Sequence, residues 1–557
     1  MRAKREKKEK SNLLKKIIII TVFIALVAIV INLAPNYIRK EITDKVNVII
    51  NNNNVTKDLK FDAFVDDNEV VYLSTKDIAN FFDEDIFYDN IYDQIITTSE
   101  TKVAALKINE KEMYVNSAKV RIYGSAIKKD EQFYLPFSEM KDVYNVDISY
   151  IKDTDIVIID SLDREQKKGN ASKNISIKYK PTIFSKDVDK VKKGDSFVVI
   201  ENLNNGWTKV RSSLGKIGYT KDITNIYTVR EKMEKQKQIE GKVSLVWDYF
   251  SEYAKAPDRT GTTINGINVV SPTFATLVEE GQGKLNVNIG DSGKRYIDWA
   301  HGKGYKVWPS ISNNSYKLTT SEILNDYKLR ESLISRIVNL TIENNFDGIN
   351  IDFEYIKLED KDMFSRFIIE LAPRLKEYGK VLSVDVTAPD GSEDWSECYN
   401  RNKIGKVADY IVFMAYDQNG ISSPKEGTTA GADWVEVNIK KFINREEVSP
   451  DKLILGMPFY TRLWKETGAK PISNVVSMKN IDSVIPSDVQ RKWNSDLKQY
   501  YVEYQKDGYT YKMWLEEEES IKAKFALMKQ YNLAGAAYWQ KDMEKSTIWD
   551  IISNEIK

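Results

Sequence analysis

The fold is decided by the stretch Phe346-Asp347-Gly348-Ile349-Asn350-Ile351-Asp352-Phe353-Glu354-Tyr355. Its β-branched and aromatic residues predict a buried strand. Because residues two apart on a strand point to the same face, one face carries Asn350, Asp352 and Glu354, and the other is apolar. Charged side chains are rarely buried unless they are paired or functional, so these three must bond one another or a ligand. A solvated edge strand is the alternative, and the apolar opposite face argues against it.

The spacing Asp-Gly-x-Asn-x-Asp-x-Glu resembles the signature of family 18 glycoside hydrolases, the chitinase-like (β/α)8 barrels, which is Asp-x-x-Asp-x-Asp-x-Glu. The match holds at Asp347, Asp352 and Glu354, and it fails at Asn350. The resemblance covers residues 241–557. It implies an α/β fold with a TIM barrel and an O-glycosyl hydrolase activity of the N-acetylglucosaminidase or chitinase type.

The sequence from Val243 onward alternates apolar segments with helical patterns, which predicts a barrel independently of the resemblance. The expected strands are Val243–Asp248, Ile267–Phe274, Lys306–Ser312, Gly348–Tyr355, Leu382–Pro389, Ala408–Asp417, Lys452–Tyr460 and Gly535–Gln540. An interruption at about 463–517 is expected to be an α+β insertion with a hairpin turned at Asp507-Gly508. In the family, an insertion at this place forms one wall of the substrate cleft.

Polar and aromatic residues follow several of these strands, where the active sites of such barrels lie. The resemblance implies that Glu354 acts as acid and then base, that Asp352 orients the substrate's acetamido group, and that Tyr416 bonds the acetamido carbonyl. It implies further substrate contacts from Asp417, Trp539, Tyr460, Met414, Asn350 and Arg462. Asp347 is expected to fix its strand and neighbours rather than to touch substrate.

The spacing of the two acids restricts the mechanism. Asp352 and Glu354 are two residues apart on one face, with Cα atoms about 6.6 Å apart. Two such neighbours cannot flank a sugar from opposite sides, as a carboxylate nucleophile and an acid must. The resemblance implies substrate-assisted retaining catalysis instead. Asn350 is expected to donate a hydrogen bond to Asp352 and so to lower its pKa.

Composition limits the other possibilities. The 557 residues indicate several domains, and 82 basic against 82 acidic residues give no reason to expect a nucleic-acid partner. The single cysteine, Cys398, cannot form an intrachain disulfide. The single histidine, His301, leaves little material for a His-based metal site or a Ser-His-Asp triad. We therefore expect no cofactor and no metal, and an ordinary surface or packing role for His301.

The N-terminus combines a basic segment, residues 1–16, with an apolar run at 17–34. This pattern predicts a single-pass transmembrane anchor with a cytoplasmic tail and an extracytoplasmic catalytic domain. The membrane is then a partner through residues 17–34, and the protein is located at the cell membrane. A cleaved signal peptide is the alternative, but no convincing small-residue cleavage site occurs near Ala34.

Two smaller modules are expected between the anchor and the barrel. Within 46–162, Val71–Phe82 recurs in outline as Phe133–Tyr144, which indicates stacked strand–helix–strand repeats. This segment resembles the N-terminal α+β repeat domain of copper amine oxidases, a spacer or adhesion module. A polar linker is expected at 163–172. Residues 172–228 carry short strands between glycine turns and resemble a bacterial SH3-type domain, which either binds the cell wall or acts as a spacer.

The resulting prediction is a membrane-anchored glycoside hydrolase that cleaves β-1,4 bonds after N-acetylglucosamine in peptidoglycan or chitin-like glycans. The anchor and the wall-type accessory domains favour peptidoglycan. Two alternatives use the same fold: a non-catalytic glycan-binding barrel, and a structural protein of the cell wall or spore. The presence of Glu354 argues against the first alternative.

Overall fold

The structure is a computed structural model that describes residues 15–16, 18–23, 25, 45–232, 239–468 and 470–557. The chain divides into two compact units. One contains Gln236–Lys557 together with Phe87–Ala105 and Tyr114–Lys119, and the other contains the remaining N-terminal residues. We describe each unit by itself.

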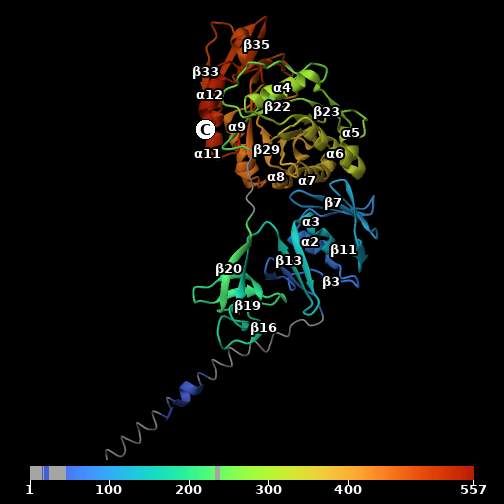
Figure 1. Cartoon of the computed structure of the whole chain (residues 1–557). Helices are drawn as coiled ribbons and strands as arrows, with labels where there is room; N and C mark the ends of the chain where they lie inside the picture. Colours follow the sequence, from blue (N-terminus) through green and yellow to red (C-terminus); the bar gives the residue numbers. More distant parts are fainter. Residues whose placement is uncertain (1–14, 17, 24, 26–44, 233–238, 469) are drawn as a thin grey trace, which may run out of the picture. The chain divides into compact units, whose positions relative to one another are not determined.

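The C-terminal unit is built on a closed parallel barrel (Figure 1). Its eight strands are β21 (Val243–Asp248), β22 (Val269–Pro272), the split third strand β25 (Lys306–Val307) and β26 (Ser310–Ser312), β27 (Gly348–Asp352), β28 (Val381–Val386), β29 (Tyr410–Met414), β30 (Leu453–Pro458) and β36 (Gly535–Trp539). The two segments of the third strand pair with opposite neighbours, β25 with β22 and β26 with β27, which closes the ring. The predicted TIM-type barrel and all eight strands are confirmed.

Helices cover the outside of this ring: α4 (Gly290–Gly302), α5 (Lys317–Asn325), α6 (Tyr327–Glu343), α7 (Lys361–Lys376), α8 (Arg401–Val407), α9 (Ala432–Asn444), α11 (Glu518–Gln530) and α12 (Ile548–Glu555). Because parallel strands are covered on both faces, they are apolar along most of their length. Every residue of β21, β28 and β30 is buried. A polar residue on the inner face of such a strand therefore marks a possible site.

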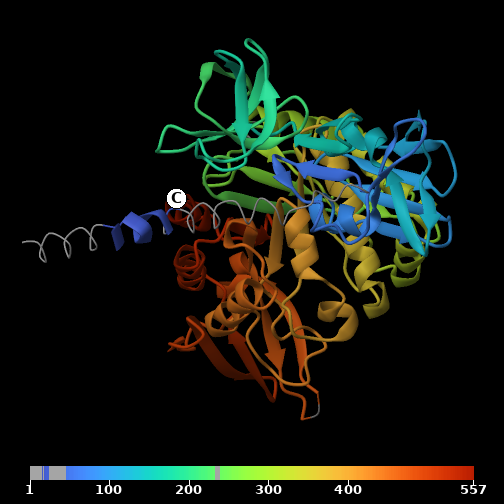
Figure 2. The same ribbon diagram turned by 90° about the horizontal axis from the view of Figure 1, so that it is seen from below.

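An antiparallel sheet interrupts the barrel after β30. Its strands are β31 (Tyr460–Lys465), β32 (Ile472–Ser477), β33 (Lys492–Asn494), β34 (Gln499–Lys506) and β35 (Tyr509–Trp514), in the order β32-β31-β35-β34-β33. The expected hairpin is present, with Lys506 opposite Tyr509 and with positive φ at Asp507 and Gly508. Figure 2 shows these strands in orange to red beside the barrel.

The repeat in the N-terminal part is confirmed at the level of secondary structure. The first copy is β4 (Val71–Ser74), α2 (Thr75–Phe81) and β5 (Phe87–Asp89). The second is β11 (Gln132–Pro136), two short helical turns (Phe137–Met140 and Lys141–Tyr144) and β12 (Val146–Ile151). Ser74 caps α2 by accepting from the Asp77 N–H, whereas Pro136 offers no side-chain cap. The helix of the first copy therefore has a side-chain N-cap that the helical turn of the second copy lacks.

The other strands of this part complete three sheets, in which β4 pairs with β11. They are β1 (Asn47–Ile50), β2 (Asn53–Asn54), β3 (Phe64–Val65), β6 (Gln94–Thr98), β7 (Val103–Lys107), β8 (Glu112–Val115), β9 (Ala118–Arg121), β10 (Ile127–Lys129) and β13 (Ile156–Ser161). The first strands of the two repeats, β4 and β11, are thus neighbours in one sheet although they lie far apart in the sequence.

Residues 166–230 form a seven-stranded antiparallel sheet in the order β16-β15-β19-β18-β17-β14-β20. The strands are β14 (Gln166–Ala171), β15 (Ile175–Lys178), β16 (Asp187–Val191), β17 (Ser196–Asn202), β18 (Thr208–Arg211), β19 (Ile217–Thr220) and β20 (Ile223–Arg230). The predicted linker at 163–172 is wrong, because β14 occupies most of it and pairs with β17 and β20. Its polar residues misled the prediction, since they lie on a strand with little burial on one face.

The predicted transmembrane anchor needs correction. A membrane-spanning helix requires about 20 apolar residues. Within the described part of the chain, no helix is long and apolar enough to cross a membrane. Of residues 17–34, only 18–23 and 25 are described, and the rest lie outside the described residues. The predicted single-pass location, with a cytoplasmic tail and an extracytoplasmic catalytic domain, is contradicted by this finding.

Candidate active site

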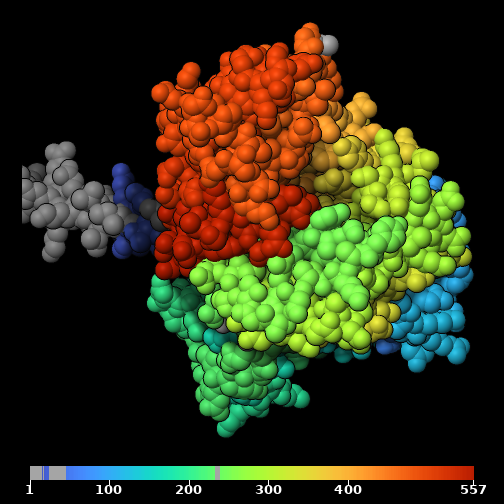
Figure 3. Space-filling view, turned by 90° about the horizontal axis from the view of Figure 1, so that it is seen from above, coloured from blue at the N-terminus to red at the C-terminus, as the bar shows by residue number. Residues whose placement is uncertain are grey.

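A cavity of about 160 Å3 opens at the C-terminal ends of the barrel strands. Its lining residues are Trp247, Asp352, Glu354, Asp385, Trp395, Met414, Tyr416, Asp417, Tyr460 and Trp539. Seven of the nine residues predicted from the sequence therefore line one cavity, and the other two, Asn350 and Arg462, lie behind it. Figure 3 views the unit from above, with orange-to-red segments of its later part beside green-to-yellow segments of its earlier part.

Glu354 lies just beyond the end of β27, where its backbone is held by a buried amide. The Glu354 N–H donates to Asn313 Oδ1 at 3.0 Å, and Asn313 Nδ2 donates to the Glu354 carbonyl at 2.8 Å. Asn313 follows β26 directly and is fully buried. This pair of bonds orients the Glu354 peptide, so the carboxyl is carried into the cavity by a rigid support.

Three of the carboxyls that line the cavity, Glu354, Asp352 and Asp385, have raised pKa values. Burial, followed by the charges of Asp352 and Asp417, raises the pKa of Glu354 to about 8. Burial raises the pKa of Asp352 to about 6. The pKa of Glu354 thus lies above that of Asp352, so Glu354 is the carboxyl suited to act as the acid and Asp352 the one suited to carry negative charge. The expected low pKa of Asp352 is wrong, because burial dominates.

Asn350 also differs from expectation. Its Nδ2 donates to Asp385 Oδ1 at 2.7 Å and to Ser383 Oγ at 3.0 Å, and its Oδ1 accepts from Trp247 Nε1 at 2.9 Å. The predicted bond from Asn350 to Asp352 does not occur among these contacts. Asn350 is fully buried below the cavity, so it supports the lining residues.

The residues after β29 and β30 form a second polar group. Arg462 Nη2 donates to Asp417 Oδ1 at 3.1 Å, and Tyr460 also hydrogen-bonds Asp417. Burial, and then the charge of Asp385, raises the pKa of Tyr416 well above its usual value. Tyr416 is therefore a neutral phenol that can donate a hydrogen bond into the cavity. Arg462 acts through Asp417.

Aromatic side chains form the rest of the lining. Trp539 ends β36 and lies with its ring centroid 5.8 Å from that of Trp247 and 6.1 Å from that of Tyr249. Sequence reasoning missed Trp247, Asp385 and Trp395. The first two are the penultimate residues of the apolar strands β21 and β28 and could have been found by the argument used for β27. Trp395 lies in the short helix Glu393–Glu397, and no sequence pattern marks it.

Asp347 lies at the opposite end of β27, away from the cavity. It accepts from Lys306 Nζ and His301 Nε2, both at 2.9 Å, and from the Val307 N–H at 3.0 Å. Burial opposes its ionisation, yet these bonds together lower its pKa. Asp347 and His301 thus tie α4 and β25 to β27.

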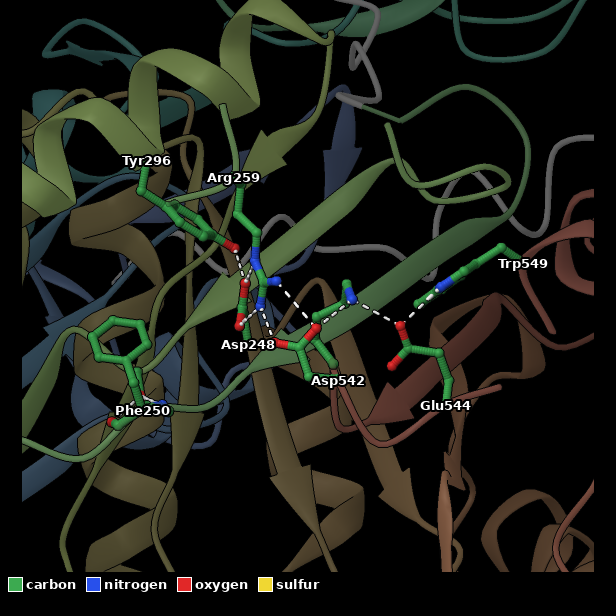
Figure 4. A network of polar contacts seen from close by, with 9 residues as sticks. Asp248, Phe250, Arg259, Tyr296, Asp542, Glu544 and Trp549 are labelled. Carbon is green, nitrogen blue, oxygen red and sulfur yellow. Dashed lines mark hydrogen bonds and ion pairs between the residues drawn. The ribbon is translucent and has the colours of Figure 1, made fainter. Parts of the chain in front are cut away.

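An ion-pair network that is buried at Asp248 and exposed at Asp542 connects the loops that follow β21 and β36 (Figure 4). Arg259 donates to both oxygens of Asp248, at 2.8 and 2.9 Å, and to both oxygens of Asp542, at 2.7 and 3.1 Å. Tyr296 also donates to Asp248 at 3.0 Å. Lys541 bridges Asp542 and Glu544, and Glu544 accepts from the Trp549 indole. Arg259 therefore holds the segment after Trp539 against the end of β21.

We expect Arg259→Met to lower the free energy of unfolding by about 3–5 kcal/mol, because Asp248 would keep a buried and uncompensated charge. Asp248 is only 2% exposed. The matched control is Arg445→Met, whose half-exposed side chain pairs with Asp390 and Glu446 and whose loss should cost less than about 1 kcal/mol. Denaturant unfolding of both variants makes the measurement. Equal effects of the two substitutions would contradict the assigned role of Arg259.

Comparison with known proteins gives two family matches. Residues 246–544 match the model of the glycosyl hydrolases of family 18, and residues 49–159 match that of the copper amine oxidase N-terminal domain. The second match confirms the resemblance of the repeat segment. Neither match reaches residues 172–228, so the SH3-type resemblance stays a prediction.

Individual relatives agree with the first match. An uncharacterised glycosylase, YvbX of Bacillus subtilis, is 27% identical over 48% of this chain and 80% of its own length. The cortical fragment-lytic enzyme of Bacillus anthracis is 24% identical over 44% of this chain and 58% of its own length.

Solved structures show the same fold. A chitinase from Chromobacterium violaceum has a TM-score of 0.51 at 22% identity, over 57% of this chain and 99% of its own. The spore cortex-lytic enzyme SleL of Bacillus cereus has a TM-score of 0.51 at 17% identity, over 67% and 91%.

Proposed function

The chain belongs to the glycosyl hydrolases of family 18, and from this premise we propose that it cleaves β-1,4 bonds after N-acetylglucosamine by substrate-assisted retaining catalysis. The substrate class is an N-acetylated glycan such as peptidoglycan or a chitin-like polymer. The observation that carries the proposal is that Glu354 and Asp352 line one small cavity at the end of β27, where burial raises the pKa of Glu354 above that of Asp352.

In the proposed reaction, Glu354 gives its proton to the leaving glycosidic oxygen as the bond to the anomeric carbon breaks. The carbonyl oxygen of the substrate's acetamido group forms the new bond to that carbon, which gives a cyclic oxazolinium ion. Asp352 bonds the acetamido N–H and offsets the positive charge, and Tyr416 donates to the carbonyl oxygen. Glu354, now ionised, takes a proton from the water that opens the ring, so its proton is restored and the β configuration is retained.

The remaining lining residues fit substrate binding. Trp539 offers an aromatic face for a sugar ring. Met414 adds apolar contact, while Asp417 and Tyr460 supply polar contacts, with Arg462 holding Asp417. The SH3-like segment at 172–228 is proposed to bind the cell wall. Such binding would place the barrel next to cell-wall glycan, which is then the expected substrate.

The roles of Glu354 and Asp352 predict a bell-shaped pH dependence. Activity should fall as the pH drops below about 6, because Asp352 must be ionised, and it should fall as the pH rises above about 8, because Glu354 must carry its proton. The measurement is kcat/KM against pH on a soluble oligosaccharide, which reports the free enzyme. A rate that keeps rising beyond pH 9 would rule out Glu354 as the acid.

One experiment tests the proposed function directly. The purified protein is incubated with peptidoglycan, with chitin oligomers and with their de-N-acetylated forms. We expect cleavage of N-acetylated glycan alone, since a free amine has no carbonyl oxygen to form the oxazolinium ion. Product anomers are read by NMR in the first minutes. A mainly α product, or equal cleavage of the de-N-acetylated polymer, would contradict the mechanism. Binding of all the glycans without cleavage would favour the non-catalytic alternative.

A further inference from the structure

Asp385 is a third carboxyl of the site, placed next to Asp352 by strand register. In the parallel pairing of β27 with β28, Asn350 lies opposite Ser383 and Ile351 opposite Val384. The next residue on each strand is Asp352 and Asp385. Neighbouring strands are about 4.8 Å apart, and both side chains line the same cavity. The two carboxyls are therefore direct neighbours.

The surroundings of Asp385 disfavour a negative charge. The residue is only 2% exposed. It faces Asp352 and Glu354 from β27 and its end, Tyr416 from the end of β29, and the Trp247 indole from β21. Within the described part of the chain, no Lys or Arg forms an ion pair with it. Burial and the charge of Asp352 raise the pKa of Asp385 well above its usual value, and these effects outweigh the opposing hydrogen bond from Asn350 Nδ2.

The hydrogen bonds of Asn350 determine which oxygen of Asp385 carries the proton. An indole N–H can only donate, so Trp247 requires Asn350 Oδ1 on its side, and Nδ2 must then face β28. Nδ2 donates to Asp385 Oδ1. That oxygen is occupied as an acceptor, which leaves Oδ2 to carry a proton. Among the described residues no protein group with an N–H or alcohol O–H donates to the Asp352 carboxylate, so a buried negative charge there needs a hydrogen bond from its neighbour Asp385.

We propose that Asp385 is a positioning residue, a neutral carboxyl that donates a hydrogen bond from Oδ2 to Asp352 and makes Asp352 the ionised member of the pair. The proposal rests on the proposed role of Asp352. With one proton on Asp385 and one on Glu354, the three carboxyls carry a single negative charge, which lies on Asp352 where the oxazolinium ion would form. Asp385 keeps its proton throughout the reaction, while Glu354 releases and regains its own.

Two substitutions test whether Asp385 acts as a neutral hydrogen-bond donor, as a charged group or only as a structural residue. Asp385→Asn keeps an N–H donor for Asp352 and an oxygen that accepts from Asn350, so most of kcat and the acid limb of the pH profile should be retained. Asp385→Leu has no donor. It should lower kcat by about 100-fold with little change in KM, as expected for loss of a preorganised hydrogen bond. It should also move the acid limb to higher pH, because the ionised form of Asp352 loses a bond that favours it.

Ser383→Ala is the matched control, because it removes the other acceptor of the same Asn350 amide and changes no carboxyl. It should leave the acid limb in place. The proposal is overturned if Asp385→Leu retains wild-type kcat with an unmoved acid limb. It is also overturned if Asp385→Asn folds and is as inactive as Asp385→Leu, because a neutral donor would then not suffice.

A measurement without turnover keeps this proposal separate from the proposed function. The 13C NMR spectrum of aspartate-labelled protein is compared with that of Asp385→Asn, and the missing carboxyl signal is followed with pH. We expect it to report a protonated carboxyl at pH 7. An ionised carboxylate there would overturn the role of Asp385 even in an active enzyme. If the wild type cleaves no N-acetylated glycan while this signal is protonated, the proposed function fails and the neutral state of Asp385 stands.

Discussion

Glu354→Gln is expected to lower kcat by about 10²–10⁴-fold, the usual contribution of a general acid or base. The amide keeps the shape of the side chain, and the two Asn313 bonds hold the backbone of residue 354, so the geometry should survive. The amide N–H is far too weak an acid to protonate the leaving oxygen, and the amide is too weak a base to take a proton from water. Glycan binding should therefore persist, because the aromatic lining of the cavity is unchanged.

The measurement is kcat on a soluble N-acetylated oligosaccharide, together with a binding titration on the same ligand. Glu359→Gln is the matched control, since it makes the same chemical change on an exposed side chain five residues away. It should behave as the wild type. A Glu354→Gln variant that retains most of the wild-type rate would remove Glu354 from its proposed role, and loss of binding would show that the substitution damages the cavity instead.

Asp352→Asn is expected to have the second large effect, a loss of about 10²–10³-fold in kcat, as is typical for groups that stabilise developing charge. The amide can still bond the substrate's acetamido group, yet it cannot offset a positive charge on the cyclic intermediate. It also removes the charge that contributes to the raised pKa of Glu354. The alkaline limb of the residual activity should accordingly move to lower pH.

Single-turnover rates and the pH profile of the variant measure these two effects. Asp362→Asn serves as the control, because its side chain lies at the exposed start of α7. If Asp352→Asn ran at nearly the wild-type rate, substrate assistance would be the wrong mechanism. If the rate fell but the alkaline limb stayed in place, the charge of Asp352 would not contribute to the raised pKa of Glu354.

Much of the barrel could be read from local sequence because its strands and helices differ in hydrophobic period. The segments around β21, β27 and β30 are short, apolar and β-branched, and each was placed within a few residues of its observed bounds. The hairpin was predicted from its turn residues, Asp507-Gly508, alone. The segment at 163–172 was misread, because β14 is polar and is recognisable as a strand only by its partners β17 and β20.

The sequence by itself determined that Asn350, Asp352 and Glu354 share a face, since alternation along one strand is a local property. Only the tertiary structure decided which residues of other strands lie next to these three side chains. The register between β27 and β28, more than thirty residues apart, brings Asp385 next to Asp352 and turns the Asn350 amide toward β28. The raised pKa values of Asp352 and Glu354 likewise depend on burial by strands from the whole ring. Such contacts and desolvation arise from chain segments that meet only on folding, so no local pattern specifies them.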